Sequence, residues 1–277
     1  MKLVSIKVNN EVKLGAIQGD RIVDLNYNGS MIDLLKSGEF GLEAARNAAE
    51  KATITYAKSE VTFVPPVVRP GKVIALGRNY AAHAAEGGAV PPDYPMLFHK
   101  THTSLIGHHQ SIVIPPVTKK VDYEAELAVI IGKTCYQVSE EDALDYVAGY
   151  TCANDVSARD LQRLTTQFTT GKMLDTFGPL GPALVTADEI DDVQNLNISL
   201  ELNGETLQSS NTSYMIFNVA FTIHFISQIC TLEPGDVILT GTPEGVGYPR
   251  NPPIFLKPGD SVTVHVENVG SLTNPVE

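Results

Sequence analysis

The stretch Asp122-Tyr123-Glu124-Ala125-Glu126-Leu127-Ala128-Val129-Ile130-Ile131-Gly132 places carboxylates at the start of a strongly apolar run. The run predicts a β-strand, and side chains two residues apart in a strand point to one face. Glu124 and Glu126 are therefore expected side by side on a face that is at least partly buried. Two close negative charges are unfavourable there unless a proton or a cation compensates them. A hard divalent cation prefers carboxylate and water oxygens, whereas an exposed strand face with two solvated glutamates is the alternative.

A third carboxylate follows downstream, because residues 147–155 predict a second strand that ends at Asp155. In the next turn Arg159 and Gln162 are three residues apart, which places them on one face of a helical turn. Asp155 could complete a set of three oxygen ligands and leave the other metal positions for water and substrate. The alternative is that Asp155 caps a helix N-terminus, a frequent use of aspartate.

An acid–base pair is predicted upstream, in residues 76–88. The alanines favour a short helix and the double glycine ends it. His83 and Glu86 are three residues apart, so the carboxylate can orient the imidazole and raise its basicity. A surface contact is the alternative for such a pair.

Two further segments are polar loops by composition. Residues 240–247 follow a predicted strand, and their backbone N–H groups and hydroxyls could bind a carboxylate, although a glycine-rich hairpin is the alternative. No Gly-Lys-Ser/Thr closes this loop, so it is not a phosphate-binding P-loop. Four histidines lie in a polar stretch without a cysteine or acidic partner at zinc-ligand spacing, and we interpret them as loop residues: His99, His102, His108 and His109.

The whole chain predicts a strand-rich α+β fold in two parts. Residues 1–65 are expected to form a small β-rich domain, because the stiff proline-containing link 64–70 follows them. Residues 66–277 would form the catalytic domain. Strands are predicted at 3–8, 11–17, 21–24, 73–76, 111–114, 126–131, 198–202, 236–240 and 261–266, and helices at 31–51, 140–147 and 214–229. Strands and helices do not alternate regularly, which argues against a doubly wound sheet or a TIM barrel.

Composition excludes several functions. The 277 residues carry a formal charge of −12 with no basic run, which argues against nucleic acid and anionic membranes as partners. No apolar segment resembles a secretory signal or spans a bilayer. The three cysteines are few and far apart, as expected for reduced thiols, and we predict a cytoplasmic protein.

Several of these segments together resemble the fumarylacetoacetate hydrolase superfamily, from about residue 70 to the C-terminus. The matching residues are Gly77-Arg78-Asn79-Tyr80-x-x-His83-x-x-Glu86, Pro95-x-x-Phe98-x-Lys100, Asp122-Tyr123-Glu124-x-Glu126-Leu127, Asn154-Asp155-x-x-Ala158-Arg159-Asp160-x-Gln162, Gly171-Lys172, Asn203-Gly204-Glu205, Leu232-x-Pro234-Gly235-Asp236 and Thr240-Gly241-Thr242-Pro243-x-Gly245-Val246-Gly247. The first 65 residues resemble the small lead-in domain of the shorter prokaryotic-type members. The additional metal-ligating aspartate of the larger tyrosine-degradation enzyme has no match here.

The resemblance implies a mixed β-sandwich roll, usually dimeric, and a role for each matching residue. Glu124, Glu126 and Asp155 would bind Mg²⁺ or Mn²⁺. His83, Glu86 and Lys172 would be catalytic, and the substrate site would be lined by Arg159, Gln162 and Thr242.

The reaction expected of such a site is cleavage of a carbon–carbon bond in a small 2-oxo acid. The metal would stabilise the enolate that remains after the bond breaks. With a water activated by the His–Glu pair the reaction is acylpyruvate hydrolysis, and with oxaloacetate it is decarboxylation. The alternatives are an isomerase or tautomerase of a hydroxymuconate-type diacid, and a non-catalytic protein that kept the fold.

Overall fold

One large mixed sheet organises the chain, and the computed structural model describes all of residues 1–277. Its strands follow the order β4-β3-β2-β1-β13-β11-β10-β16-β6-β7, with β5 paired to β1 and β8 paired to β13. A second sheet has the order β15-β14-β17-β18, and β9 pairs with β12. The strands are β1 (Lys2–Val8), β2 (Glu11–Gln18), β3 (Arg21–Asp24), β4 (Thr55–Ala57), β5 (Thr62–Val64), β6 (Val73–Gly77), β7 (Met96–His99), β8 (Leu105–Ile106), β9 (Val121–Asp122), β10 (Ala125–Ile131), β11 (Val147–Asn154), β12 (Ser157–Ala158), β13 (Gly178–Thr186), β14 (Asn197–Leu202), β15 (Glu205–Asn211), β16 (Val237–Leu239), β17 (Ser261–Val266) and β18 (Gly270–Pro275).

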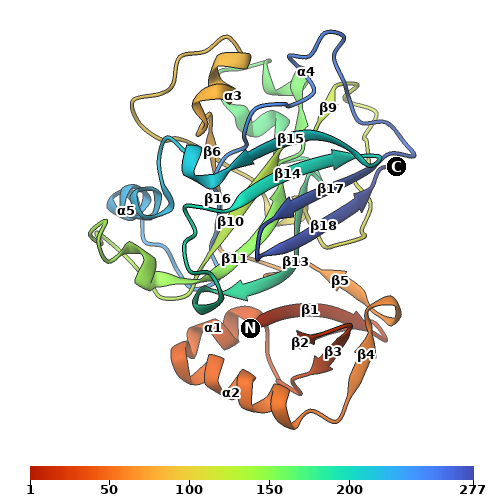
Figure 1. The fold of residues 1–277 in the computed structure, drawn as a ribbon, viewed down its shortest axis with the longest axis vertical. Helices are drawn as coiled ribbons and strands as arrows, with labels where there is room; N and C mark the ends of the chain where they lie inside the picture. The colour runs from red at the N-terminus through yellow and green to blue at the C-terminus, as the bar shows by residue number, and fades with distance from the viewer.

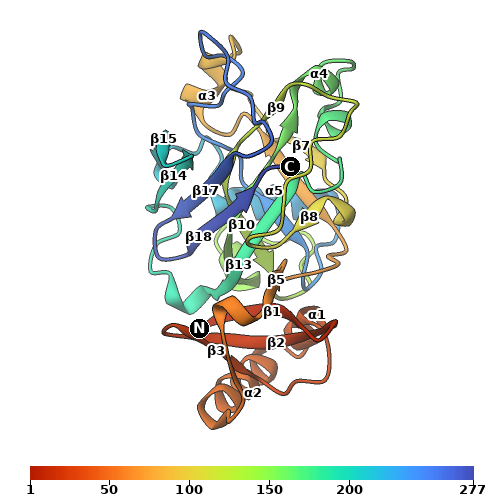
Figure 2. The same ribbon diagram turned by 90° about the vertical axis from the view of Figure 1, so that its right-hand side faces the viewer.

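Five short to medium helices surround these sheets (Figures 1 and 2). They are α1 (Met31–Lys36), α2 (Gly38–Lys51), α3 (Ala81–Glu86), α4 (Arg159–Gln162) and α5 (Val219–Ile229). None of them has the length and apolar character needed to cross a membrane. In both views α3 and α4 lie at the end of the molecule opposite to α1 and α2. The predicted strand-rich α+β fold is confirmed.

The core lies on both faces of β10, every residue of which is buried. Leu127 and Val129 point toward the four-stranded sheet and pack in one cluster with Leu200 of β14. Ala128 and Ile130 point the other way, into the cluster that contains the buried residues of α1. Because side chains alternate along this buried strand, β10 contributes to both hydrophobic clusters, one on each of its faces.

The N-terminal unit continues the large sheet rather than standing apart from it. Strand β1 pairs with β13 through Lys2–Val185 and Leu3–Leu184, and β5 pairs with β1. The link at residues 64–70 follows directly after β5. The division of the chain at residue 66 stays a prediction.

Two predicted elements are wrong. Residues 111–114 form no strand, because Ile112 makes only an isolated bridge with Val276, and the hydrogen bond from Ile114 N to Glu277 O is followed by Pro115 and Pro116, which have no N–H to donate. The helix predicted at 140–147 shrinks to a 3₁₀ turn at Ala143–Tyr146, because Val147 already belongs to β11.

Two other elements are interrupted. The helix predicted at 31–51 consists of α1 and α2, which meet at Ser37 before Gly38, a residue with φ of 59°. The stretch 122–132 is also not one strand, because Tyr123 and Glu124 lie between β9 and β10. Glu124 therefore lies just before the N-terminal end of β10, and its side chain lines a cavity.

Candidate metal and acid–base site

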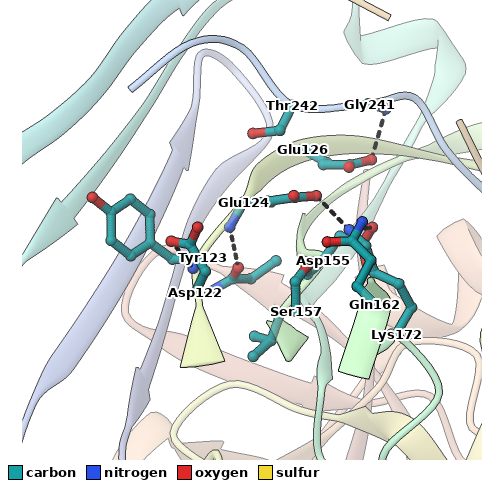
Figure 3. A network of polar contacts seen from close by, with 12 residues as sticks. Asp122, Tyr123, Glu124, Glu126, Asp155, Ser157, Gln162, Lys172, Gly241 and Thr242 are labelled. Atoms are coloured by element: carbon teal, nitrogen blue, oxygen red, sulfur yellow. Dashed lines mark hydrogen bonds and ion pairs between the residues drawn. The ribbon is translucent and has the colours of Figure 1, made fainter. Parts of the chain in front are cut away.

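Three buried carboxylates meet where β10 begins and β11 ends. One oxygen each of Glu124, Glu126 and Asp155 lies within 4.8 Å of the others, as Figure 3 illustrates. Antiparallel pairing of Ala125 with Asn154 brings the two strand ends together, and Asp155 N donates to Glu124 O over 2.9 Å. The solvated-face alternative is wrong, because all three side chains are buried. Asp155 is not a cap either, since Ala158 stands at the N-cap of α4.

Three cations surround two of these carboxylates. Lys172 Nζ lies 2.6 Å from Glu124 Oε2 and 2.6 Å from Asp155 Oδ2. Arg159 Nη1 lies 2.7 Å from Glu124 Oε1, and Lys100 Nζ lies 2.7 Å from Asp155 Oδ1. Burial alone would raise the pKa of Glu124, but Lys172 and then Arg159 outweigh it and lower the pKa to about 2. Glu124 is therefore held ionised.

Glu126 differs from its neighbours because it has no cationic partner. Its Oε2 accepts a hydrogen bond of 2.7 Å from Gly241 N, whereas its Oε1 is buried without any partner. Burial, and then the charges of Asp155 and Glu124, raise the pKa of Glu126 well above its usual range. A buried oxygen without a partner is costly. A divalent cation bound by the three carboxylates would satisfy Oε1 and offset the repulsion, so the residues present fit a metal ion.

The predicted acid–base pair faces the same cavity. His83 Nδ1 lies 2.8 Å from Glu86 Oε1, and Glu86 Oε2 accepts a hydrogen bond of 2.8 Å from Gly245 N. The side chains of His83 and Glu86 are only 15% and 21% exposed. This is therefore not a simple surface contact, because the pair ties α3 to the loop after β16. With Nδ1 directed at the carboxylate, Nε2 is the ring nitrogen left for proton transfer.

A cavity of about 330 Å³ collects most of the predicted site residues. Its lining includes His83, Glu86, Glu124, Arg159, Gln162, Lys172 and Thr242. Glu126 and Asp155 belong to the carboxylate cluster but not to this lining. The sequence therefore predicted a set of residues that the fold brings together, and their individual roles stay predictions.

The residues predicted to bind substrate are fixed by hydrogen bonds. Arg159 Nη1 donates to Gln162 Oε1 over 3.1 Å, and Arg159 Nη2 is buried without a partner. Thr242 Oγ1 accepts a hydrogen bond of 2.9 Å from Gln208 Nε2. Arg159 Nη2 is the one polar side-chain atom of these three residues that is buried without a partner.

Sequence reasoning missed three residues that organise the site. Lys100, which forms an ion pair with Asp155, and Asp122 both occur in the motifs of the resemblance, but no role was predicted for either. Asp122 is fully buried and accepts hydrogen bonds from Arg159 Nε at 2.8 Å and Gly247 N at 2.8 Å. Gln208 holds Thr242 from β15, and no local pattern marks it. The apolar surroundings of Asp122, at the start of a buried strand, were the one signal that could have revealed it.

Lys172→Met is expected to destabilise the metal-free protein, because Glu124 and Asp155 both lose a buried counter-charge. Removing one partner of a buried pair costs about 3–5 kcal/mol. A bound cation would replace part of that charge. The melting temperature should therefore fall strongly in EDTA and less in saturating Mn²⁺, and thermal unfolding in both buffers measures the difference. An equal loss in both buffers would show that Lys172 and the metal do not share these carboxylates.

Comparison with known proteins places this geometry in a family. A model described as Fumarylacetoacetate (FAA) hydrolase C-terminal matches residues 72–277. Oxaloacetate tautomerase FAHD2A, mitochondrial, from Homo sapiens is 47% identical, with 100% of this chain and 91% of that protein covered.

Two solved structures are similar over their whole length. Fumarylacetoacetate hydrolase from Exiguobacterium antarcticum is 34% identical with a TM-score of 0.88, and the match covers 100% of this chain and 99% of that one. Maleylpyruvate hydrolase from Sphingobium sp. SYK-6, in complex with manganese (II) ion and pyruvate, is 32% identical with a TM-score of 0.85 and coverage of 100% and 98%.

A strand-rich fold with three buried carboxylates beside a His–Glu pair defines a class of enzymes whose acidic cluster can hold a metal ion. The chain belongs to the fumarylacetoacetate hydrolase family. It is an enzyme of that family, as the sequence predicted. Cleavage, which the sequence predicted, and tautomerisation, which it gave as an alternative for a hydroxymuconate-type diacid, are both represented among the names of its relatives.

Proposed function

We propose that this enzyme binds Mg²⁺ or Mn²⁺ through Glu124, Glu126 and Asp155 and enolises a small 2-oxo acid. One observation carries the proposal: a buried carboxylate oxygen without a partner, Glu126 Oε1, lies in a cluster that borders the same cavity as the His83–Glu86 pair. A bound cation would polarise the 2-oxo group and stabilise the negative charge that develops on enolisation.

The side chains around the cavity supply the remaining functions. His83, oriented by Glu86 through Nδ1, exchanges a proton with the carbon next to the 2-oxo group at its Nε2. Arg159 binds the substrate carboxylate with its free Nη2 donor. Lys172 keeps Glu124 and Asp155 ionised and ready to bind the cation.

Tautomerisation is the reaction that these groups complete without further components. The enol hydroxyl loses its proton and carbon C3 gains one, so no bond between carbons breaks. We propose oxaloacetate as the first substrate to test, because the human relative at 47% identity is named an oxaloacetate tautomerase.

Carbon–carbon cleavage is the second candidate and uses the same enolate. In hydrolysis a water activated by His83 attacks the distal carbonyl carbon, and the bond between that carbon and C3 breaks. The acyl part leaves as a carboxylic acid, and the electron pair stays on the enolate, which then takes a proton at C3. The name of the maleylpyruvate hydrolase complex with manganese (II) and pyruvate favours this candidate. Decarboxylation of oxaloacetate would release CO₂ without activation of a water.

The choice of metal, the homodimer and the location complete the proposal. The manganese (II) in the maleylpyruvate hydrolase complex makes Mn²⁺ the first ion to test.

We propose a homodimer in solution, with no nucleic acid or membrane as partner, and light scattering tests the mass of the dimer. We also propose a cytoplasmic location, although the human relative is named as mitochondrial; cell fractionation tests this.

The deciding experiment follows the enol of oxaloacetate by its ultraviolet absorbance and measures pyruvate released from oxaloacetate and from acetylpyruvate. Each assay is run with Mn²⁺, with Mg²⁺ and with EDTA. Loss of the enol without pyruvate that requires both enzyme and metal supports tautomerisation, and pyruvate that requires both enzyme and metal supports cleavage. Activity that is unchanged in EDTA, or no activity on either substrate, would contradict the proposal.

A further inference from the structure

Two arginines of the cavity have no carboxylate partner within the chain. Arg78 and Arg163 both line it, and their side chains contact aromatic rings instead. The acidic residues of the lining are already paired, Glu124 with Lys172 and Arg159, and Glu86 with His83. Two guanidinium charges therefore remain available to a ligand, in a protein whose net charge is −12.

The position of Arg163 relative to the carboxylate cluster is set by α4. Arg159 and Arg163 are four residues apart, so they lie on the same face of this helical turn, about 6 Å apart along its axis. Arg159, at the inner end, contacts Glu124. Arg163, at the C-cap, is exposed to the cavity mouth. Arg159 in α4 and Arg163 at its C-cap therefore both present a guanidinium group to the cavity, and of the two only Arg159 contacts a carboxylate of the cluster.

Arg163 is held in place although it is exposed. Its guanidinium carbon lies 4.1 Å from the centre of the Tyr248 ring, and its Nη1 donates to the Tyr248 hydroxyl. Tyr248 N donates to Asp122 Oδ2 over 2.9 Å, and the same oxygen accepts from Arg159 Nε. One fully buried carboxylate thus anchors both the inner arginine and the support of the outer one.

Arg78 is fixed by its backbone and by an aromatic wall. Its φ of 58° lies in the left-handed region, which is uncommon for a residue with a side chain and often marks a functional position. Its guanidinium carbon lies 5.8 Å from the centre of the Phe168 ring. Phe168 packs edge-on against Phe98 and fills the space beside Gly77, where a Cβ would come within 3.1 Å of the ring.

We propose that Arg78 and Arg163 form a subsite for a second carboxylate, so that the enzyme selects 2-oxo diacids over 2-oxo monoacids. This inference rests on the proposed function, because the 2-oxo acid end of the ligand must bind to the metal and to Arg159. The cavity of about 330 Å³ is at the small end of the range for ligand sites, which suits a short diacid.

The test compares two stable ligands of equal chain length, 2-oxoglutarate and 2-oxopentanoate, which differ only in the second carboxylate. Calorimetric titration of the Mn²⁺-loaded protein gives a Kd for each. The wild type is expected to bind the diacid at least about tenfold more tightly, as a charge-assisted contact provides. In the double variant Arg78→Gln/Arg163→Gln the preference should fall to about one, with the Kd of the monoacid unchanged.

Three controls make the result specific. Arg69→Gln, at an exposed arginine outside the cavity, should keep the full preference. Arg163→Lys should keep part of it, because the charge remains while the planar donor pair is lost. An unchanged preference in the double variant, or an equal loss for both ligands, would overturn the subsite alone. Failure of both ligands to bind the wild type in a Mn²⁺-dependent manner would overturn the proposed function and the subsite with it.

Discussion

Glu126→Gln is expected to abolish Mn²⁺ binding and turnover while leaving the metal-free protein as stable as the wild type or more stable. The amide keeps an oxygen for the hydrogen bond from Gly241 N, so the local geometry is retained. It also removes a buried carboxyl group whose ionised form no cation of the chain compensates. The amide nitrogen replaces Oε1, the carboxylate oxygen without a partner in the structure, so the metal loses this ligand atom.

Calorimetry and thermal unfolding measure both halves of this result. At a Mn²⁺ concentration of 100 times Kd the ion should raise the free energy of unfolding of the wild type by about 2.7 kcal/mol. The variant should show no such rise. Glu141→Gln, an exposed site, is the matched control and should behave as the wild type. Tight Mn²⁺ binding by Glu126→Gln would contradict the assignment of the metal ligands.

His83→Ala is expected to reduce enolisation by about 10²–10⁴-fold, the contribution that a positioned acid–base group provides. Affinity for Mn²⁺ should be retained, because no hydrogen bond joins His83 to the three carboxylates. Hydrolysis of acetylpyruvate should fall further than decarboxylation of oxaloacetate, since only hydrolysis requires an activated water.

Steady-state rates with both substrates and a Mn²⁺ titration test this prediction. His265→Ala, on β17 and outside the cavity, is the control for loss of a histidine and should retain full activity. Glu86→Gln should give an intermediate loss, because the imidazole remains but loses the carboxylate that orients it. Equal residual rates of hydrolysis and decarboxylation in His83→Ala would exclude activation of water by this side chain.

The sequence alone determined the residue types of the site and the local elements that carry them. Glu124 and Glu126 are two residues apart beside a buried strand, and His83 and Glu86 are one helical turn apart. Such spacings are local, so periodicity in the chain is enough to predict that each pair shares a face. Apolar or alternating runs likewise predicted β10, β14 and β17 to within a residue or two.

Local patterns failed where distant pairing decided the outcome. The run 111–114 has the composition of a strand, but its one bridge is that of Ile112 with Val276, and the next hydrogen bond, from Ile114 N to Glu277 O, lies directly before Pro115. The helical pattern at 140–147 loses Val147 to β11, whose partner β10 fixes the register. Strand formation depends on a partner that the local sequence does not contain.

Only the tertiary structure decided which charges meet. Lys100 lies 55 residues from Asp155, and the Asp122 carboxylate lies 125 residues from Gly247, whose N–H it accepts. Their contacts exist because antiparallel and parallel pairing of β11, β10, β16 and β6 brings the strand ends into one place. Each residue type is compatible with many folds. These charges interact strongly because they are buried, and they become buried only when the strands have paired and the chain has folded.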